Sequence, residues 1–269
     1  MWREVCRVMI AEWLRVRKSR AMAAGLVTYL AVVAMFYLTY HLLVRRSFTG
    51  IPTGFYLSGS VLSAAVTSLE FAMTLIVAFS VAREFSAGTI QQVWVRPLSR
   101  MSWLSGKLLT SVVVLKVWWV LTLLFVLVVA GVQLGFSDLM EKEYLIHSAG
   151  SLWWALLLTV ALTTLALAAE IGIVAVCALI IGNPGGTIAV AVIARFILQL
   201  ASNWDLLRPL ILPTYVTAPL GQFIAMSKGL PLPESWGHLT RTCLIGSLVW
   251  ILAGWLWASW IVKRREVLN

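Results

Sequence analysis

The stretch SLWWALLLTVALTTLALAAEIGIVAVCALII, residues 151–181, decides the fold class of this chain. It contains a single charged residue, Glu170, and it is longer than the roughly 20 apolar residues that a helix needs to cross about 30 Å of hydrocarbon. A second run, residues 108–134, also exceeds this length and also contains one charge, Lys116. Runs of this kind predict membrane-spanning helices, so lipid must form part of the solvent of the chain.

The composition of the whole chain points to the same class. Of its 269 residues, 61% are hydrophobic and 12% are charged, and the mean hydropathy is +0.91. A soluble domain normally carries about 25% charged residues. The sequence therefore predicts an all-α integral membrane protein without a soluble domain of its own. No short apolar core followed by a cleavage site is present near the start, so we expect no cleavable signal peptide.

Working outward from the long runs, we divide the chain into two parts. Residues 1–20 place apolar side chains at three- and four-residue spacing with basic ones opposite, which predicts an amphipathic helix on the membrane surface. Residues 21–269 form a six-span transmembrane domain. Its spans are expected at residues 21–44, 58–82, 108–134, 151–181, 187–202 and 243–262, with a tight turn at 182–186.

The connecting segments are short, apart from one. Residues 45–57 and 135–150 are expected to be loops, the second of them acidic. Residues 204–240 hold five of the eight prolines and two apolar pieces, 206–212 and 215–226, which are too short to cross a bilayer. We expect these pieces to be short re-entrant or interfacial helices before the last span. They either shape an exit for cargo or pack the bundle as a lid.

The net charge of +10 is placed at helix ends and not along an aromatic-rich basic stripe, so nucleic acid is not an expected partner. With both termini inside, the inner segments hold thirteen Lys and Arg residues and the outer segments hold six. The positive-inside rule then predicts a multi-pass protein of the cell (cytoplasmic) membrane with both termini cytoplasmic. The three cysteines and three histidines form no metal or disulfide pattern, and no catalytic set is expected.

The polar segment over residues 83–107 is expected to be a short cytoplasmic structure. Glu84 comes directly after the second span, Gly88 permits a sharp bend, and Thr89 can cap a short helix that Pro97 prevents from continuing. A second short helix, residues 99–106, is expected to join the third span.

This pattern resembles the permease subunits of type-2 ABC exporters. The matching residues are Glu84, Gly88, Thr89, Pro97, Arg100 and Lys107. The layout agrees as well, from the basic N-terminal helix to the apolar outer segment before the last span. The resemblance implies that residues 83–107 form a coupling segment that docks on a cytoplasmic ABC ATPase subunit. It also implies that two permease chains, here expected as a homodimer, form the pathway at their interface. A solvated connecting loop is the alternative interpretation of the segment.

The chain itself is not expected to hydrolyse ATP. Gly106 and Lys107 match two positions of a phosphate-binding loop. That motif also needs a Gly five residues before Gly106, where Met101 stands, and a Ser or Thr after Lys107, where Leu108 stands. We therefore expect a non-catalytic membrane subunit that binds no cofactor, with ATP and Mg²⁺ on a separate ATPase subunit. Permeases of the resembling class imply export, and a hydrophobic or amphiphilic substrate such as a drug, a peptide antibiotic or a lipid is preferred, with antibiotic resistance as one role.

Four ionisable residues fall within the expected spans, namely Glu70, Lys116, Glu170 and Arg195. A charge at bilayer depth costs a few kcal/mol, so each needs a partner or water. We expect the two acids to neutralise the two bases, although the pairing is not readable from sequence. These residues either hold the bundle together or line a polar pathway. The second reading supports an alternative function, an ion-coupled secondary transporter, although no internal repeat accompanies it.

Overall fold

The computed structural model describes residues 2–18, 53–90, 99–141, 143–202, 204 and 208–264, together with residues 27, 29–31, 33–35, 37 and 38. Its elements, in chain order, are α1 (Trp2–Lys18), α4 (Gly54–Val77), the π-helical η2 (Ala78–Ala82), α5 (Arg83–Ser86), α7 (Arg100–Leu134), β1 (Leu139–Glu141), β2 (Tyr144–His147), α8 (Ala149–Ile181), α9 (Pro184–Ala201), the 3-10 helix η3 (Arg208–Leu210), α10 (Leu212–Ser227) and α11 (Trp236–Arg264).

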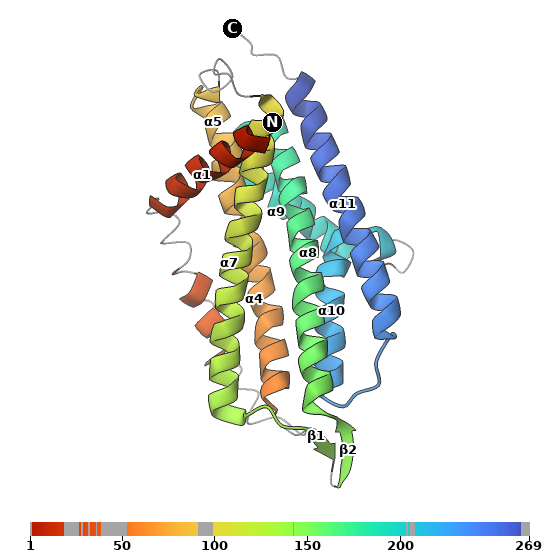
Figure 1. The fold of residues 1–269 in the computed structure, drawn as a ribbon. Helices are drawn as coiled ribbons and strands as arrows, with labels where there is room; N and C mark the ends of the chain where they lie inside the picture. The colour runs from red at the N-terminus through yellow and green to blue at the C-terminus, as the bar shows by residue number, and fades with distance from the viewer. Residues whose placement is uncertain are drawn as a thin grey trace.

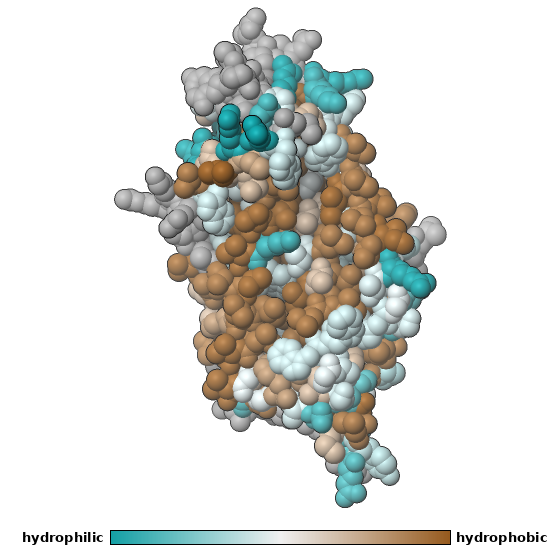
Figure 2. Space-filling model, viewed as in Figure 1, coloured by the Kyte–Doolittle hydropathy of each residue, from teal (hydrophilic) through white to brown (hydrophobic). Residues whose placement is uncertain are grey.

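The long helices lie side by side in a bundle (Figure 1). We call the end that holds α1, α5 and the last turn of α11 the basic end, and the opposite end, from which β1 and β2 project, the hairpin end. Figure 2 shows hydrophobic surface over most of the middle of the bundle, with hydrophilic surface gathered toward both ends. A band of this kind is what a helix bundle presents to lipid.

Five helices in the described residues are long and apolar enough to cross a membrane, which confirms an all-α membrane protein. They are the continuous helix Gly54–Ser86 (α4, η2 and α5), α7, α8, α9 and α11. They coincide with five of the six expected spans, whereas the span expected at residues 21–44 lies largely outside the described residues. The antiparallel β1–β2 hairpin stands where an irregular acidic loop was expected.

Capping side chains move two helix starts away from the expected positions. The loop expected over residues 45–57 ends earlier, because Thr53 caps α4 by accepting a bond from the Tyr56 amide at 3.3 Å. Before α9, Gly182 ends α8 with φ of 67° and Asn183 accepts the Gly185 amide at 2.9 Å. Pro184 then occupies the first helical position, so α9 begins inside the expected turn.

The apolar piece expected at residues 215–226 forms most of α10, which packs inside the bundle. α10 runs beside the half of α8 nearest the hairpin end (Figure 1). Thr159 of α8 donates a hydrogen bond to the Pro219 carbonyl at 3.3 Å. Phe223 is fully buried and lies next to Gly59 of α4. α10 therefore joins α8 and α4 on this side of the bundle.

Two glycines, Gly172 and Gly254, face each other where α8 and α11 pack together. A Cβ atom added to Gly254 of α11 would lie 3.2 Å from the Cα atom of Gly172 in α8. Small residues of this kind let two membrane helices approach through their backbones, where dispersion contacts hold them together.

The variant Gly254→Leu is expected to force α8 and α11 apart. Overpacking of this kind costs about 1–3 kcal/mol, so the thermal midpoint of the purified protein in detergent should fall. The matched control is Gly237→Leu in the same helix, where an added Cβ meets nothing within 4 Å. Equal midpoints for the two variants would contradict the close crossing.

Candidate functional site

Helix α1 packs across the start of α7 through one of its apolar faces. Val5 and Val8 are buried against α7, and a Cβ atom on Gly106 would lie 2.6 Å from a Val8 methyl carbon. On another face of α1, Trp2 and Ile10 are 71% and 58% exposed. The expected amphipathic helix is therefore present, with one apolar face on the bundle and one left free.

A fully buried lysine joins three elements at the basic end. The Lys107 side chain of α7 is 0% exposed, and its Nζ atom lies 2.8 Å from Glu12 Oε1 of α1 and 2.9 Å from Glu84 Oε1 of α5. The same Nζ donates to the Ser80 carbonyl in η2 at 2.7 Å. One ammonium group thus uses its three donors on three different segments.

Two further side chains complete this cluster, which we call the basic-end network (Glu12, Arg15, Ser80, Glu84, Trp103 and Lys107). Arg15 Nη1 lies 3.0 Å from Glu12 and 2.9 Å from Glu84, and Trp103 Nε1 donates to Glu84 at 2.9 Å. The bond to the Glu84 carboxylate raises the pKa of Arg15 above its usual value. Two cations balance two carboxylates, which is the condition under which buried charges are tolerated.

The π-helical turn η2 supplies the carbonyl that Lys107 uses. A π-helical turn is wider than an α-helical one and often marks a functional position in a helix. Here the Ser80 carbonyl accepts from Lys107 Nζ at 2.7 Å. The ammonium therefore holds the backbone of the second span at the point where its helical geometry changes.

The structure brings together some of the six residues that the resemblance singles out. Glu84 and Lys107 form an ion pair, and Thr89 Oγ1 donates to the Glu84 carbonyl at 3.3 Å. Gly88 makes the expected bend with φ of 67°, and Arg100 starts α7. Pro97 lies outside the described residues, as do residues 91–95 of the short helix that Thr89 is expected to cap.

Helix α7 begins at a serine cap that also contacts α1. Ser99 Oγ accepts from the Ser102 amide at 3.0 Å, so the short helix expected at 99–106 continues without a break into the third span. Ser102 Oγ in turn donates to Glu4 of α1 at 2.8 Å, and this bond lowers the pKa of the Glu4 carboxyl group. A second polar contact thus ties α1 to α7.

Sequence reasoning missed four members of the basic-end network, namely Glu12, Arg15, Ser80 and Trp103. A signal for Glu12 exists, because it follows the buried Val5 and Val8 by seven and four residues on the same face of α1. An acid on a packed face indicates a buried partner. Nothing in the sequence of η2 marks the Ser80 carbonyl, because every residue carries one.

A second charged cluster, which we call the triad, lies within the spans. Arg195 of α9 places Nη1 2.8 Å from Glu170 of α8 and pairs through Nη2 with Glu70 of α4. The side chains of Glu70, Glu170 and Arg195 are 1%, 17% and 25% exposed. One guanidinium group faces two carboxyl groups, so with both ionised the triad carries one excess negative charge.

Lys116 does not join the triad, so the expected pairing of two acids with two bases is only half met. Lys116 is exposed on α7, and none of the ion pairs among the described residues includes it. Its neighbours Leu115 and Trp118 are buried, whereas Val113 and Val117 are exposed beside it. The rotation of α7 therefore points Lys116 out of the bundle, and Arg195 alone serves both acids.

These features define a multi-pass α-helical membrane protein with one charged cluster at its basic end and another within its spans. The family model described as "ABC-2 family transporter protein" matches residues 8–197, which is well over half of the chain. The chain belongs to this family, and it is a type-2 ABC permease, a membrane subunit of a kind that is normally non-catalytic. A comparison with curated proteins finds no match.

The variant Lys107→Met is expected to destabilise the protein, because among the described side chains it leaves the buried Glu12 and Glu84 paired with Arg15 alone. Breaking a buried pair in this way costs about 3–5 kcal/mol. Adding Glu84→Gln to Lys107→Met should recover part of the loss. Thermal unfolding in detergent measures the effect, with Lys116→Met, an exposed lysine of the same helix, as the control. Equal losses for the two lysines would refute the buried network.

The variant Arg195→Lys is expected to lower stability although it keeps the charge. A compact ammonium group cannot contact Glu70 and Glu170 with the planar fork of a guanidinium group. We expect a loss of about 1–3 kcal/mol, the size of one charged hydrogen bond. The control is Arg241→Lys, an exposed arginine of α11. If both variants keep the wild-type thermal midpoint, Arg195 does not bridge the two acids.

Proposed function

We propose that this permease is the transmembrane subunit of an ATP-driven exporter and that residues 83–107 transmit the motion of a separate ABC ATPase subunit. The observation that carries the proposal is the buried contact of Lys107 with Glu84, Glu12 and Ser80. It ties the start of the segment to its end and to α1. A push on the segment therefore moves α1, α4 and α7 together.

The roles of the segment's residues follow from their exposure. Glu84 and Lys107 are 7% and 1% exposed, so in our proposal they position the segment and do not touch the ATPase. Residues 86–89, including Gly88 and Thr89, are exposed at the basic end. We assign the docking surface to this turn and to Arg100 at the start of α7. From the family pattern alone we expect Pro97 to contribute as well. ATP and Mg²⁺ bind to the ATPase subunit.

We place the basic end in the cytoplasm. The last turn of α11 carries Lys263 and Arg264 at this end, and Arg264 lies 4.4 Å from the centre of the Trp260 ring. Basic residues on cytoplasmic segments and tryptophan near the membrane surface are typical of this arrangement. The free apolar side chains Trp2 and Ile10 of α1 then suit the inner membrane interface.

We propose a homodimer whose second copy covers α9. Within α9, all of which is described, only Thr187 is buried. Large apolar side chains such as Ile193, Phe196 and Ile197 are more than half exposed. Arg195 lies on the same helix and is 25% exposed, so the triad borders this face. Two copies that meet near α9 would enclose a pathway with polar and apolar walls, which suits a hydrophobic or amphiphilic substrate such as a drug, a peptide antibiotic or a lipid.

One observation favours a second candidate, the ion-coupled transporter. The triad sets two carboxyl groups against one guanidinium group, and an intramembrane site with spare acid can hold a proton or a cation. This candidate requires transport driven by an ion gradient without an ATPase. Reconstitution of the purified permease alone, with a proton gradient as the only energy source, tests it directly.

Co-purification from native membranes tests the exporter. The tagged permease should retain a protein that carries a phosphate-binding loop, near equal stoichiometry. The variant Gly88→Val should weaken this association, because a β-branched residue at positive φ costs about 1–3 kcal/mol of strain, and 1.4 kcal/mol corresponds to roughly tenfold in affinity.

The control for this experiment is Gly135→Val. Gly135 also has positive φ, and a Cβ atom there also meets nothing within 4 Å, but it lies at the hairpin end. Only the variant at the basic end should release the ATPase. Equal retention by both variants would move the docking surface elsewhere.

A further inference from the structure

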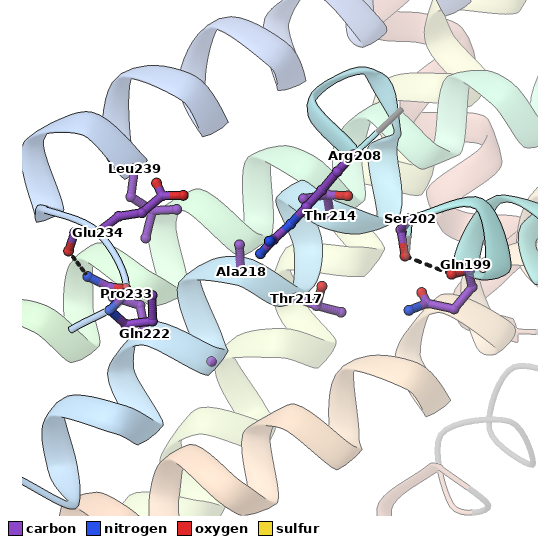
Figure 3. A pocket seen from close by; sticks show the side chains of 11 residues that line it. Gln199, Ser202, Arg208, Thr214, Thr217, Ala218, Gln222, Pro233, Glu234 and Leu239 are labelled. Atoms are coloured by element: carbon purple, nitrogen blue, oxygen red, sulfur yellow. Dashed lines mark hydrogen bonds between the residues drawn. The ribbon is translucent and has the colours of Figure 1, made fainter. Parts of the chain in front are cut away.

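A polar cavity opens between the end of α9, η3, α10 and the start of α11 (Figure 3). Its volume is about 460 Å³, within the range of pockets that hold small molecules. Neither charged cluster contributes to its wall. The α9 residues Gln199 and Ser202 line it, and they follow Arg195 by four and seven residues on the same helical face. The cavity therefore continues the polar stripe that begins at the triad.

Arg208 supplies a positive charge to the cavity that no described side chain neutralises. Its side chain reaches from η3 across the cavity toward Ala218 of α10 (Figure 3). Thr214 and Thr217 of α10 line the wall nearby, and the buried Thr214 Oγ1 atom has no hydrogen-bond partner. The Thr217 hydroxyl donates to the Pro213 carbonyl at 3.0 Å, so Thr214 supplies the unpartnered hydroxyl group. A guanidinium group with such a hydroxyl group nearby is a suitable site for the oxygens of a phosphate or carboxylate group.

Glu234 supplies the opposite charge from the loop before α11. Its carboxylate contacts His238 Nδ1 at 3.1 Å and forms no ion pair with Arg208. The Glu234 carbonyl accepts a hydrogen bond from Gln222 Nε2, which fixes this loop to α10. Figure 3 shows Arg208 and Glu234 on different sides of the cavity. Because this acid and this base do not neutralise each other, the cavity offers two subsites of opposite charge.

The surroundings of the cavity suit a ligand with an apolar part. Phe196, Ile197 and Leu200 of α9 are 65%, 58% and 55% exposed, on the helix that lines the cavity with Gln199 and Ser202. A polar head in the cavity therefore has an apolar surface beside it along which a tail can lie.

We infer that the cavity binds the zwitterionic head group of an amphiphile, with its phosphate or carboxylate group on Arg208 and its ammonium group near Glu234. A purely anionic head group is repelled by Glu234, and a purely cationic head group is repelled by Arg208. As the cargo class of an exporter, this inference rests on the proposed function. The binding itself requires neither ATP nor an ATPase.

Calorimetric titration of the purified full-length permease in detergent tests the inference. The probes are dihexanoyl phosphatidylethanolamine, the same lipid with a phosphatidylglycerol head, and soluble phosphoethanolamine. We expect saturable binding of the ethanolamine lipid and roughly tenfold weaker binding of the glycerol lipid, as the loss of one charged contact predicts. If phosphoethanolamine binds as tightly as the ethanolamine lipid, the head-group site is supported and the tail is not recognised. If phosphoethanolamine binds more weakly than the lipid, the tail contributes to binding and the ligand is a membrane lipid.

The chain offers a matched pair of variants for this titration. Gly221 lines the cavity, and a Cβ atom there meets nothing within 4 Å, so the side chain of Gly221→Phe begins in open space at the cavity wall and takes up cavity volume. Gly150 in the first turn of α8 has the same open space and does not line the cavity, so Gly150→Phe is the control. Gly221→Phe and Arg208→Gln should each weaken binding roughly tenfold or more. Glu234→Gln should reduce the difference in affinity between the ethanolamine lipid and the glycerol lipid.

Two outcomes would overturn the inference. One is the absence of saturable binding of both ethanolamine probes to the wild type, and the other is equal binding by Gly221→Phe and Gly150→Phe. ATPase co-purification with the same variants separates this result from the proposed function. A permease that binds the probe but retains no ATPase refutes only the exporter, and one that retains its ATPase but binds no probe refutes only the head-group site.

Discussion

The buried ammonium group of Lys107 is the constraint on which the basic end depends. A charge without access to water must be paired, so Glu12, Glu84 and the Ser80 carbonyl have to meet around one atom. This requirement places α1 across α7 and holds the end of the second span against both. Apolar packing at Val5 and Val8 adds contact area, but it is not directional. The ion pairs of Lys107 therefore fix the relative positions of α1, α7 and the end of the second span.

The triad plays a comparable part for α9, which has little other support. α9 buries only Thr187 in the described structure, so apolar packing contributes little to its position. The guanidinium group of Arg195 instead binds Glu70 and Glu170 on two neighbouring helices. A helix held mainly by polar contacts changes position when those contacts change, which suits a wall of a transport pathway. Helices α8 and α11, by contrast, contact each other through their backbones at two glycines.

Much of this architecture follows from hydropathy, because long apolar runs in a membrane have few alternatives to helix. The second span was expected to begin at residue 58, but α4 begins at Gly54 because Thr53 caps the helix there. Glu84 and Lys107 were found through a family pattern, whereas Glu12 was missed because its buried partner Lys107 lies 95 residues away in sequence. Lys116 and Arg195 look alike in sequence, as single charges in apolar runs. Only helix rotation separates them, and distant packing sets that rotation.

The polar stripe of α9 connects the triad with the cavity at the end of the same helix. Arg195, Gln199 and Ser202 share one face, which begins at the triad and ends in the cavity beside Arg208 and Glu234. A head group that moves along this face meets polar side chains at each turn, while an attached tail keeps contact with the exposed apolar residues of the same helix. In our proposal the protein does not have to enclose the whole ligand, because lipid or a second copy solvates the tail. The membrane helices themselves would then recognise the head group of an amphiphile, through the cavity at the end of α9.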